Sequence, residues 1–597
     1  MSDDAAVPPP RPGLLDRVAA LRPALLLSVA SFVFLALSAP ALLRDSDTAD
    51  ENMHLWAGWR HLAEGDYTPN PWHPPLAKLV QAIPMMLLGA RAPEDPAAFS
   101  DVSPWSQGYA FLYRSGNSPA AVLWGPRVTG LLWGIAVLVC AYLLSRDLFG
   151  PTGALVTLVL TTACPTLLAH AHLATTDAPA TALLLLTLIA FRSLIRAPGP
   201  LPSLGFGILL GLALCTKHNL MFLVPLFACL AAAAAFLRRR ERGETPEPPR
   251  RLVRRAAPLA WIALVAAGIV GTIWAVYGFR YAPSPDPAVT LSWWFPTPGL
   301  GGTLVGFARE HHLLPEAYLY GVAFLRQYME AGHPAYALGR YSQMGWVWYF
   351  PFAFLVKTPA STLALFAWGL RAASRSGRAR VLLDRMIVML PLVVYWALAL
   401  RSTVDVGVRH LLPVLPLLAI LAGSIAEGAG IGTALKGRVV VGLLAATLGG
   451  VASSAPHFLA YFNLPSTLVA ERHAMLVDSN LDWGQDLGRL KAYLDRHGIA
   501  SVKLAYFGNA SPRALGLNHE RLPGFNLYSR YEPEWKPAGE LRPGDWVAVS
   551  ATCYVGVLSS DKRYYLDRLG GLEPIARIGH SILLYRIPSP GESHAGP

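Results

Sequence analysis

The chain has 597 residues and a formal net charge of +12, and 53% of its residues are hydrophobic while only 15% are charged. Soluble proteins carry about 25% charged residues, so this composition, with a mean hydropathy of +0.38, excludes an ordinary water-soluble fold. Arginine clusters between apolar segments account for the positive charge, which argues against a nucleic acid as partner.

Eleven apolar stretches predict an α-helical polytopic membrane domain over residues 1–457. The first stretch follows a polar N-terminal segment without a clear cleavage site, so we interpret it as an uncleaved helix. The stretches lie at 24–43, 126–145, 151–170, 178–196, 202–216, 219–237, 257–277, 346–369, 386–401, 411–426 and 438–457.

The distribution of charge predicts the topology. Residues 237–255 carry eight arginines against three glutamates, and residues 371–385 carry five arginines against one aspartate, so both loops are expected on the cytoplasmic side. Residues 44–122 hold five basic and nine acidic residues and are expected on the opposite side. The N-terminus is then cytoplasmic in a cytoplasmic (inner) membrane, and three large segments, 44–125, 278–345 and 458–597, face outward.

The last outward segment, 458–597, has the pattern of a small extracytoplasmic α/β domain. Strands are predicted within 475–480, 501–508, 545–557 and 581–587, with an amphipathic helix at 484–498. In the first outward loop, residues 74–90 predict a helix that lies in the membrane interface.

Asp50 and Glu51 follow the first span, in TADENMHLWAGWR. A carboxylate at the membrane edge can accept a proton from an incoming hydroxyl or amine, so both are candidate catalytic residues. The alternative is a solvated loop with ordinary charges. Asp177, in the outward turn before the fourth span, is a second candidate acid, and its alternative role is that of a helix N-cap.

Cationic side chains at outer helix ends could hold a phosphate. Each cation taken alone is also explained as an interfacial anchor. For NPWHPPLAK the alternative is a proline-capped interfacial helix with a snorkelling lysine. The candidates are His73, Lys78, Arg127, Lys217, His218, Arg409 and His410. Lys357 lies within the eighth span and needs an acidic or phosphate partner unless it snorkels to the interface.

These motifs, taken in order, resemble the protein O-mannosyltransferases, because an acidic pair follows the first span, HPPLAK comes about twenty residues later and an aspartate precedes the fourth span. The wider resemblance is to polyprenyl-phosphate-dependent glycosyltransferases of the GT-C fold, including the lipid A aminoarabinose transferases. It covers the first 220 residues best. GRYSQMGWVWYFPFAFLVKTP and DSNLDWGQDLGRLKAYL look like bacterial lipid-carrier-dependent glycosyltransferases.

The resemblance implies roles for single residues. Asp50 matches the catalytic base, Glu51 would support it or orient the acceptor, and Asp177 matches the second outer acid. His73 stands where the aminoarabinose transferases have a lysine and the O-mannosyltransferases a histidine. Arg127, Lys217 and Arg409 are phosphate candidates by position. The acceptor or loop candidates are His54, His333, Tyr341, Lys357 and Asp482, although Asp482 alternatively caps a helix.

The implied activity is transfer of a hexose or pentose from a polyprenyl-phosphate donor in the membrane lipid, by an inverting displacement. No cofactor is assigned. Outward histidines (His54, His312, His333) are compatible with a divalent metal, but their spacing matches no metal-site pattern. No β-trefoil module is visible, so a protein, lipid or glycan acceptor stays open.

Two rival classes remain: a lipid-linked substrate transporter or flippase, and a scaffold with an outer binding domain. Charged residues within apolar segments and proline-broken helices fit a transporter too. Geometry separates them: an enzyme gathers Asp50, Asp177 and the cations at one outward site, whereas a transporter places its polar groups near the midplane.

Overall fold

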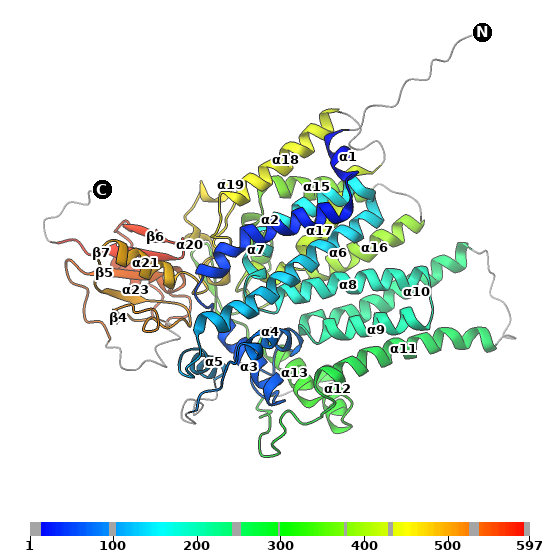
Figure 1. The fold of residues 1–597 in the computed structure, drawn as a ribbon, viewed down its shortest axis with the longest axis horizontal. Coiled ribbons are helices and arrows are strands. Elements are labelled where there is room, and N and C mark those ends of the chain that lie inside the picture. The colour runs from blue at the N-terminus through cyan, green and yellow to red at the C-terminus, as the bar shows by residue number, and fades with distance from the viewer. Residues whose placement is uncertain are drawn as a thin grey trace, which may run out of the picture.

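The structure, a computed structural model, describes residues 13–94, 103–241, 252–295, 299–374, 379–427, 434–524 and 537–589. Long helices form a bundle, and a small unit containing a β-sheet lies against one end of it (Figure 1). The fold class predicted from the sequence, an α-helical membrane protein with a C-terminal α/β unit, is therefore confirmed. Six helices of the described part are long and apolar enough to cross a membrane, or seven if a bent pair counts as one span.

The bundle consists of helices rich in leucine, alanine and valine. Its α-helices are α1 (Leu14–Ala19), α2 (Pro23–Arg44), α6 (Pro119–Thr162), α7 (Pro165–Ala171), α8 (Asp177–Arg196), α9 (Pro200–Leu214), α10 (Leu223–Glu241), α11 (Leu252–Val276), α14 (Tyr349–Lys357), α15 (Ala360–Ala373), α16 (Ala379–Ala399), α17 (Val414–Ala422) and α18 (Ala434–Ala452). Short 3₁₀ helices adjoin them: η2 (His218–Phe222), η3 (Val408–Leu411) and η4 (Gly423–Ala426).

The predicted count of about eleven spans is not confirmed, because several of the apolar helices are too short or too bent to pass as single spans. The stretches at 126–145 and 151–170 lie mainly in α6, which consists of two helices joined at Gly150, where φ is 77°. The chain turns back there, because Thr157 Oγ1 donates to Ser145 Oγ at 2.7 Å, so the two stretches pack side by side as separate helices. The stretch at 346–369 is broken into α14 and α15, which are bent by 115°. Pro359 explains the break, since it lacks an N–H group and disfavours helical geometry in Thr358.

Close packing holds the bundle together around α6, which contacts α2, α4, α8 and α17. The tightest pair is α9 with α11, where glycine allows the two backbones to approach. A Cβ atom on Gly207 would lie 2.4 Å from the carbonyl oxygen of Val265. Small residues at such contacts are the usual means by which membrane helices pack.

Shorter elements form the outward segments: α3 (Glu51–Ala63), α4 (Leu76–Leu87), α5 (Pro104–Tyr113), α12 (Gly299–Glu310), α13 (Glu316–Ala331), and the hairpin of β1 (Ala335–Ala337) with β2 (Arg340–Ser342). α4 is the helix predicted at 74–90. It buries Ala77 and Met85 against the protein while Leu87 is 82% exposed, as expected for a helix in the membrane interface.

The C-terminal unit is built on a five-stranded mixed sheet in the order β4-β3-β5-β7-β6. β3 pairs in parallel with β4 and β5, and β7 pairs antiparallel with β5 and β6. The elements are α19 (Leu464–Thr467), α20 (Arg472–Met475), η5 (Asp478–Asn480), α21 (Leu487–Arg496), β3 (Val502–Ala505), β4 (His519–Arg521), β5 (Trp546–Ser550), α22 (Ala551–Tyr554), α23 (Tyr564–Leu569), β6 (Ala576–Ile578) and β7 (Ile582–Arg586).

Two strand predictions are corrected. The segment 475–480 is not a strand of the sheet, because only Leu476 makes a bridge, to Ala337, before the chain turns into η5. The segment 545–557 is a strand only to Ser550 and continues as α22. Both segments are apolar because they are buried, and burial alone does not distinguish a strand from a turn.

The C-terminal unit is bound to the bundle by charge and by backbone hydrogen bonds. Arg489 of α21 contacts Asp45, just after α2, with 2.6 Å between Nη2 and Oδ1. The backbone N–H groups of Ser46 and Ala49 donate to the carbonyl groups of Gln485 and Trp483. The first outward loop and the C-terminal unit therefore form one packed region, while the domain boundary at 457/458 stays a prediction.

The ends of the bundle agree with the predicted grouping of the loops. α1 and the ends of α10 and α11 that flank the arginine-rich segment lie far from the sheet, whereas α3 and α5 lie on the side of the bundle nearer the sheet (Figure 1). The protein is thus a multi-pass membrane protein with two chemically different ends. Which end faces the cytoplasm stays a prediction from the charge of the loops.

Candidate functional site

Four charged side chains meet where four helices begin or end, beside the C-terminal unit. Asp50 precedes α3, Asp177 begins α8, Lys217 follows α9 and Arg409 lies in η3. Arg409 Nη2 is 3.1 Å from Asp50 Oδ2, and Arg409 Nη1 is 3.6 Å from Asp177 Oδ2. Lys217 Nζ is 2.5 Å from Asp177 Oδ1. Residues from 50 to 409 therefore form one cluster, which we call the outer charge cluster.

The outer charge cluster is partly open. The side chains of Asp50, Lys217 and Arg409 are 19%, 15% and 13% exposed, whereas that of Asp177 is 2% exposed. Asp50 is the N-cap residue of α3, but its side chain makes no capping hydrogen bond. Its Oδ1 atom accepts no hydrogen bond from any described residue, so this carboxylate is the one that can meet a ligand.

Asp177 is not the helix N-cap that was the alternative interpretation of it. The N-cap of α8 is Thr176, and Asp177 occupies the first helical turn, where the helix dipole favours a negative charge. Its carboxylate instead takes Lys217 as partner. Asp177 therefore fixes Lys217 and, more weakly, Arg409 at the base of the cluster.

Glu51 and Arg127 form a second, closed ion pair next to the cluster. Both side chains are fully buried, with Nη2 to Oε2 at 2.7 Å and Nε to Oε1 at 2.9 Å. Glu51 also accepts hydrogen bonds from the backbone N–H groups of Thr48 and Ala174. Neither group has the exposure that substrate contact requires, so only a supporting role of Glu51 beside Asp50 stays a prediction.

Arg127 is also corrected as a phosphate candidate. Besides its two bonds to Glu51, it donates to the carbonyl oxygens of Leu42 and Asp45 through Nη1 and to that of Ser46 through Nη2. All five guanidinium N–H groups are therefore used within the protein. Arg127 closes the junction between α2 and α3 rather than binding a ligand.

Lys78 likewise has its amine occupied by hydrogen bonds to the backbone. It is fully buried, and its Nζ donates to the carbonyl oxygens of Asn70 at 2.9 Å and His73 at 2.8 Å. Burial lowers the pKa of Lys78 well below its ordinary value. The residue therefore shapes the HPPLAK corner, and its predicted contact with a phosphate is not supported.

Three histidines lie near this corner. The ring centroids of His54 and His73 are 5.1 Å apart, and burial is the main cause that lowers the pKa of His54 to about 3 and that of His73 well below its ordinary value. His73 is partly exposed, so this imidazole can meet a ligand. His218 is buried against Tyr318, and His410 lies over Phe350.

The acceptor candidates do not gather at one place. His333 is near the cluster, because Asp50 and Arg409 both act on its pKa, which burial lowers. Tyr341 instead donates to the carbonyl oxygen of Val555 at 2.7 Å, within the C-terminal unit. Tyr341 therefore holds the β1–β2 hairpin in place, and its contact with an acceptor stays a prediction.

Lys357 and Asp482 also take structural partners. Lys357 donates to the carbonyl oxygens of Leu459 and Asn480 and lies over the ring of Phe462, so the expected acidic partner is replaced by carbonyl groups and an aromatic face. Asp482 is not a helix cap, because the N-cap of α21 is Asp486. Its Oδ2 accepts from the backbone N–H of Thr552, which links η5 to α22.

Sequence reasoning missed three residues of the segment DSNLDW as neighbours of the outer charge cluster. Ser479 accepts a hydrogen bond from Arg409, and Trp483 lies under its guanidinium group. Asp478 adopts a left-handed backbone (φ 56°), and burial raises its pKa to about 7 while Arg409 opposes that shift. The unusual backbone at a charged residue beside the cluster marks this segment, whose contact with Arg409 no sequence pattern predicts.

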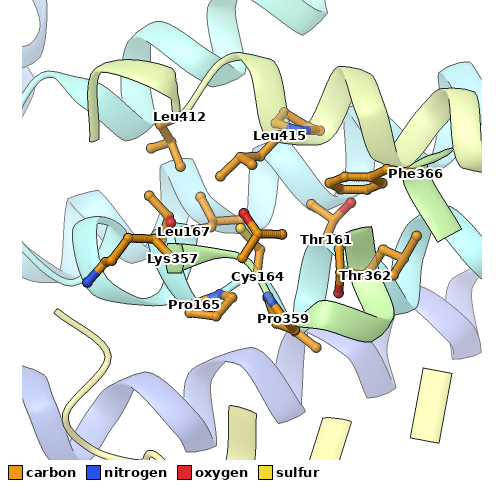
Figure 2. A pocket seen from close by; sticks show the side chains of 15 residues that line it. Thr161, Cys164, Pro165, Leu167, Lys357, Pro359, Thr362, Phe366, Leu412 and Leu415 are labelled. Carbon is orange, nitrogen blue, oxygen red and sulfur yellow. The ribbon is translucent and has the colours of Figure 1, made fainter. Parts of the chain in front are cut away.

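A separate small pocket lies inside the bundle, where α7 begins and α14 meets α15 (Figure 2). Its volume is about 20 Å³, enough for roughly one water molecule. Leu167, Phe366, Leu412 and Leu415 line it, and the amine of Lys357 points away from these apolar side chains. This pocket is distinct from the outer charge cluster and supplies no reactive group to it.

No group of three or more potential metal ligands gathers within the described ranges. In the outer charge cluster, the two carboxylates of Asp50 and Asp177 already have cationic side chains between them. No residue of the cluster is therefore assigned to a metal.

Residues 119–245 match the model of a family described as dolichyl-phosphate-mannose-protein mannosyltransferase. This match confirms the predicted resemblance to the protein O-mannosyltransferases for the part of the chain that carries Arg127, Asp177 and Lys217. Asp50 and Arg409 lie outside the matched residues. Among curated protein sequences, no match was found.

Solved structures also resemble this chain over most of its length. ArnT from Cupriavidus metallidurans bound to undecaprenyl phosphate is 14% identical with a TM-score of 0.44, over 94% of this chain and 97% of that one. The apo oligosaccharyltransferase of Archaeoglobus fulgidus is 13% identical with a TM-score of 0.43, over 86% and 63%. AglB of the same organism, in complex with an inhibitory peptide and a dolichol-phosphate, is 12% identical with a TM-score of 0.39, over 72% and 55%.

Proposed function

We propose that this protein is a membrane glycosyltransferase that transfers a sugar from a polyprenyl-phosphate donor to an acceptor at the outer face of the cytoplasmic membrane. The observation that carries the proposal is the outer charge cluster, in which one accessible carboxylate stands beside two cations at the ends of membrane helices. The family match over residues 119–245 supports the same class of donor.

In the proposed reaction Asp50 is the general base. The acceptor hydroxyl or amine gives its proton to the free Oδ1 of Asp50 while its oxygen or nitrogen bonds to the anomeric carbon of the sugar. The bond between that carbon and the phosphate oxygen breaks on the opposite face. The anomeric configuration is inverted, and polyprenyl phosphate leaves with the bonding electron pair.

Arg409 and Lys217 would stabilise the departing phosphate. The leaving group gains negative charge as the sugar departs, and positioned cations in a poorly hydrated site stabilise such charge strongly. In the free protein these cations are paired with Asp50 and Asp177. A phosphate that approaches Arg409 competes with Asp50 for the guanidinium group, which would free the carboxylate for the acceptor.

His73 and His333 are the remaining candidates for ligand contact. Neutral His73 lies on the corner that Lys78 stabilises and could donate a hydrogen bond to a phosphate oxygen. His333 lies near Asp50 and Arg409, just before the β1–β2 hairpin, where an acceptor could approach. Sugar identity, mannose included, and the choice among protein, lipid and glycan acceptors are not determined by these groups.

The geometry favours an enzyme over a transporter. The four charged residues lie at helix ends, on the side of the C-terminal unit, rather than in the middle of long helices. A transporter is expected to place its substrate groups near the bilayer midplane, between half-helices. The break between α14 and α15 is of that type, but the pocket beside it is apolar and has room for about one water molecule.

The test uses the purified full-length protein with a panel of polyprenyl-phosphate hexoses and pentoses and a membrane extract as the source of acceptors. We expect release of polyprenyl phosphate from at least one donor, and loss of this release in Asp50→Asn. Asp286→Asn is the matched control, because Asp286 is an exposed aspartate of another outward segment. Full activity in Asp50→Asn would overturn the assignment of the base.

A further inference from the structure

We propose that the segment Asp478–Trp483 of the C-terminal unit positions Arg409, so that this unit is part of the catalytic centre and not only an appended domain. The inference rests on the proposed function, in which Arg409 faces the lipid phosphate. It goes further by assigning Ser479 and Trp483 as positioning residues for that cation.

Two side chains of the segment hold the guanidinium group directly. Arg409 Nε donates to Ser479 Oγ at 3.2 Å. The guanidinium carbon lies 4.2 Å from the centre of the Trp483 ring, within the range of a cation–π interaction. The ring restrains the guanidinium from one side, and the serine fixes its rotation.

The backbone around Arg409 is held by the same segment. Val408 N–H donates to Asn480 Oδ1 at 2.8 Å, and Ser479 Oγ donates to the carbonyl oxygen of Val406 at 2.9 Å. A Cβ atom on Gly407 would lie 2.1 Å from Ser479 Oγ, so only glycine allows this approach. The 3₁₀ turn η3 is therefore built onto the segment and not onto α17 alone.

Trp483 also contacts the segment before α3, which carries the proposed base Asp50. Its carbonyl oxygen accepts a hydrogen bond from the backbone N–H of Ala49 at 3.0 Å, one residue before Asp50. The residue is 2% exposed, and its own N–H donates to Gln485 Oε1 at 2.8 Å. Trp483 thus sets the relative position of Asp50 and Arg409, which come from opposite parts of the sequence.

This arrangement affects chemistry as well as folding. Arg409 lies between two carboxylates, and without the ring it is free to turn fully onto them. A cation paired in this way is less available to a phosphate, and small errors in the position of a catalytic group reduce rates strongly. Loss of the ring should therefore lower the rate of transfer more than it lowers the stability of the fold.

The test compares Trp483→Phe with Trp483→Leu in the full-length protein, with the polyprenyl-phosphate sugar that the wild type uses best. Trp546→Leu is the matched control, because Trp546 also lies near an arginine of the C-terminal unit, with Arg586 at 6.0 Å. We expect kcat to fall about tenfold in Trp483→Leu, as the loss of a strong cation–π contact implies, and to be largely restored by Trp483→Phe. Trp546→Leu should keep kcat within about twofold.

Ser479→Ala provides a second measurement if Trp483→Leu does not fold. It removes the bond to Arg409 Nε and also the donor to the carbonyl oxygen of Val406, so kcat should fall several-fold while the melting temperature falls by only a few degrees. Wild-type kcat in Ser479→Ala, or in a folded Trp483→Leu, overturns the inference. If Asp50→Asn is then inactive, the proposed function still stands, whereas transfer that survives in Asp50→Asn rejects the proposed function itself.

Discussion

Two neighbouring acids follow the first membrane helix, and they differ in burial and in how their arginine partners are used. Glu51 is fully buried, and its partner Arg127 has every donor satisfied by the protein. Asp50 is 19% exposed, and its partner Arg409, which is 13% exposed, also contacts Ser479 and Asp177. An acid and an arginine therefore form a closed pair in one case and an open pair in the other, and what separates the two pairs is access to a ligand.

The closed pair should give the largest effect. Arg127→Ala leaves the Glu51 carboxylate buried and unpaired, which costs about 3–5 kcal/mol in comparable cases. We expect a large fall in melting temperature, or failure to express, measured by thermal unfolding in detergent. Normal stability in Arg127→Ala would contradict a structural role for the pair.

The open pair should affect activity and not folding. Arg409→Ala removes a partly exposed cation, so the fold should persist while transfer falls about 100-fold, as is typical when one charge-stabilising group is lost. Measured kcat and the melting temperature of the same sample separate the two effects. A matched variant on the surface, Arg340→Ala, should change neither, because Arg340 is exposed on β2.

Asp482 is a buried acid outside both pairs, and it should make the stability of the fold depend on pH. Burial raises its pKa from 3.8 to about 7, so between these values the native state binds more protons than the unfolded state. Stability should therefore fall as pH rises from about 4 to 7. Asp482→Asn should make the free energy of unfolding less dependent on pH, by about 1 kcal/mol per pH unit in that window. Unfolding measured at several pH values tests this. An unchanged slope would reject the shifted acid.

Lys78 should have a structural role and not a role in ligand binding, although it belongs to the HPPLAK motif. Lys78→Met leaves the carbonyl groups of Asn70 and His73 unpaired, which should cost about 1–2 kcal/mol of stability. The affinity for undecaprenyl phosphate should change little at a temperature where the variant is folded. A binding titration tests this, and loss of lipid-phosphate binding from a folded variant would restore the predicted phosphate contact.

Much of the fold was predictable because membrane helices and arginine-rich loops leave strong patterns in composition. The apolar stretches, the interfacial helix at 74–90 and the helix at 484–498 all correspond to helices. The number of spans was not predictable, because the break at Pro359 depends on local geometry that apolarity does not record. The strand predicted at 475–480 failed for the same reason, since buried residues also occur in turns.

The candidate site was predictable only as a set of residues, not as an arrangement. Asp50, Asp177, Lys217 and Arg409 share a position at outer helix ends, but no spacing indicates that Arg409 meets Asp50 across 359 positions of sequence. Nor could adjacency show that Glu51 turns inward. Trp483 and Ser479 were missed because their role depends on the contact between the C-terminal unit and η3, which is a tertiary property.

The most direct measurement compares Asp50→Asn with Glu51→Gln in one preparation, with transfer and thermal unfolding recorded for both. The account predicts that Asp50→Asn keeps the wild-type melting temperature and loses transfer, whereas Glu51→Gln loses stability. Full transfer in Asp50→Asn, or a Glu51→Gln protein that is stable and inactive, would contradict the division into an open reactive pair and a closed structural one.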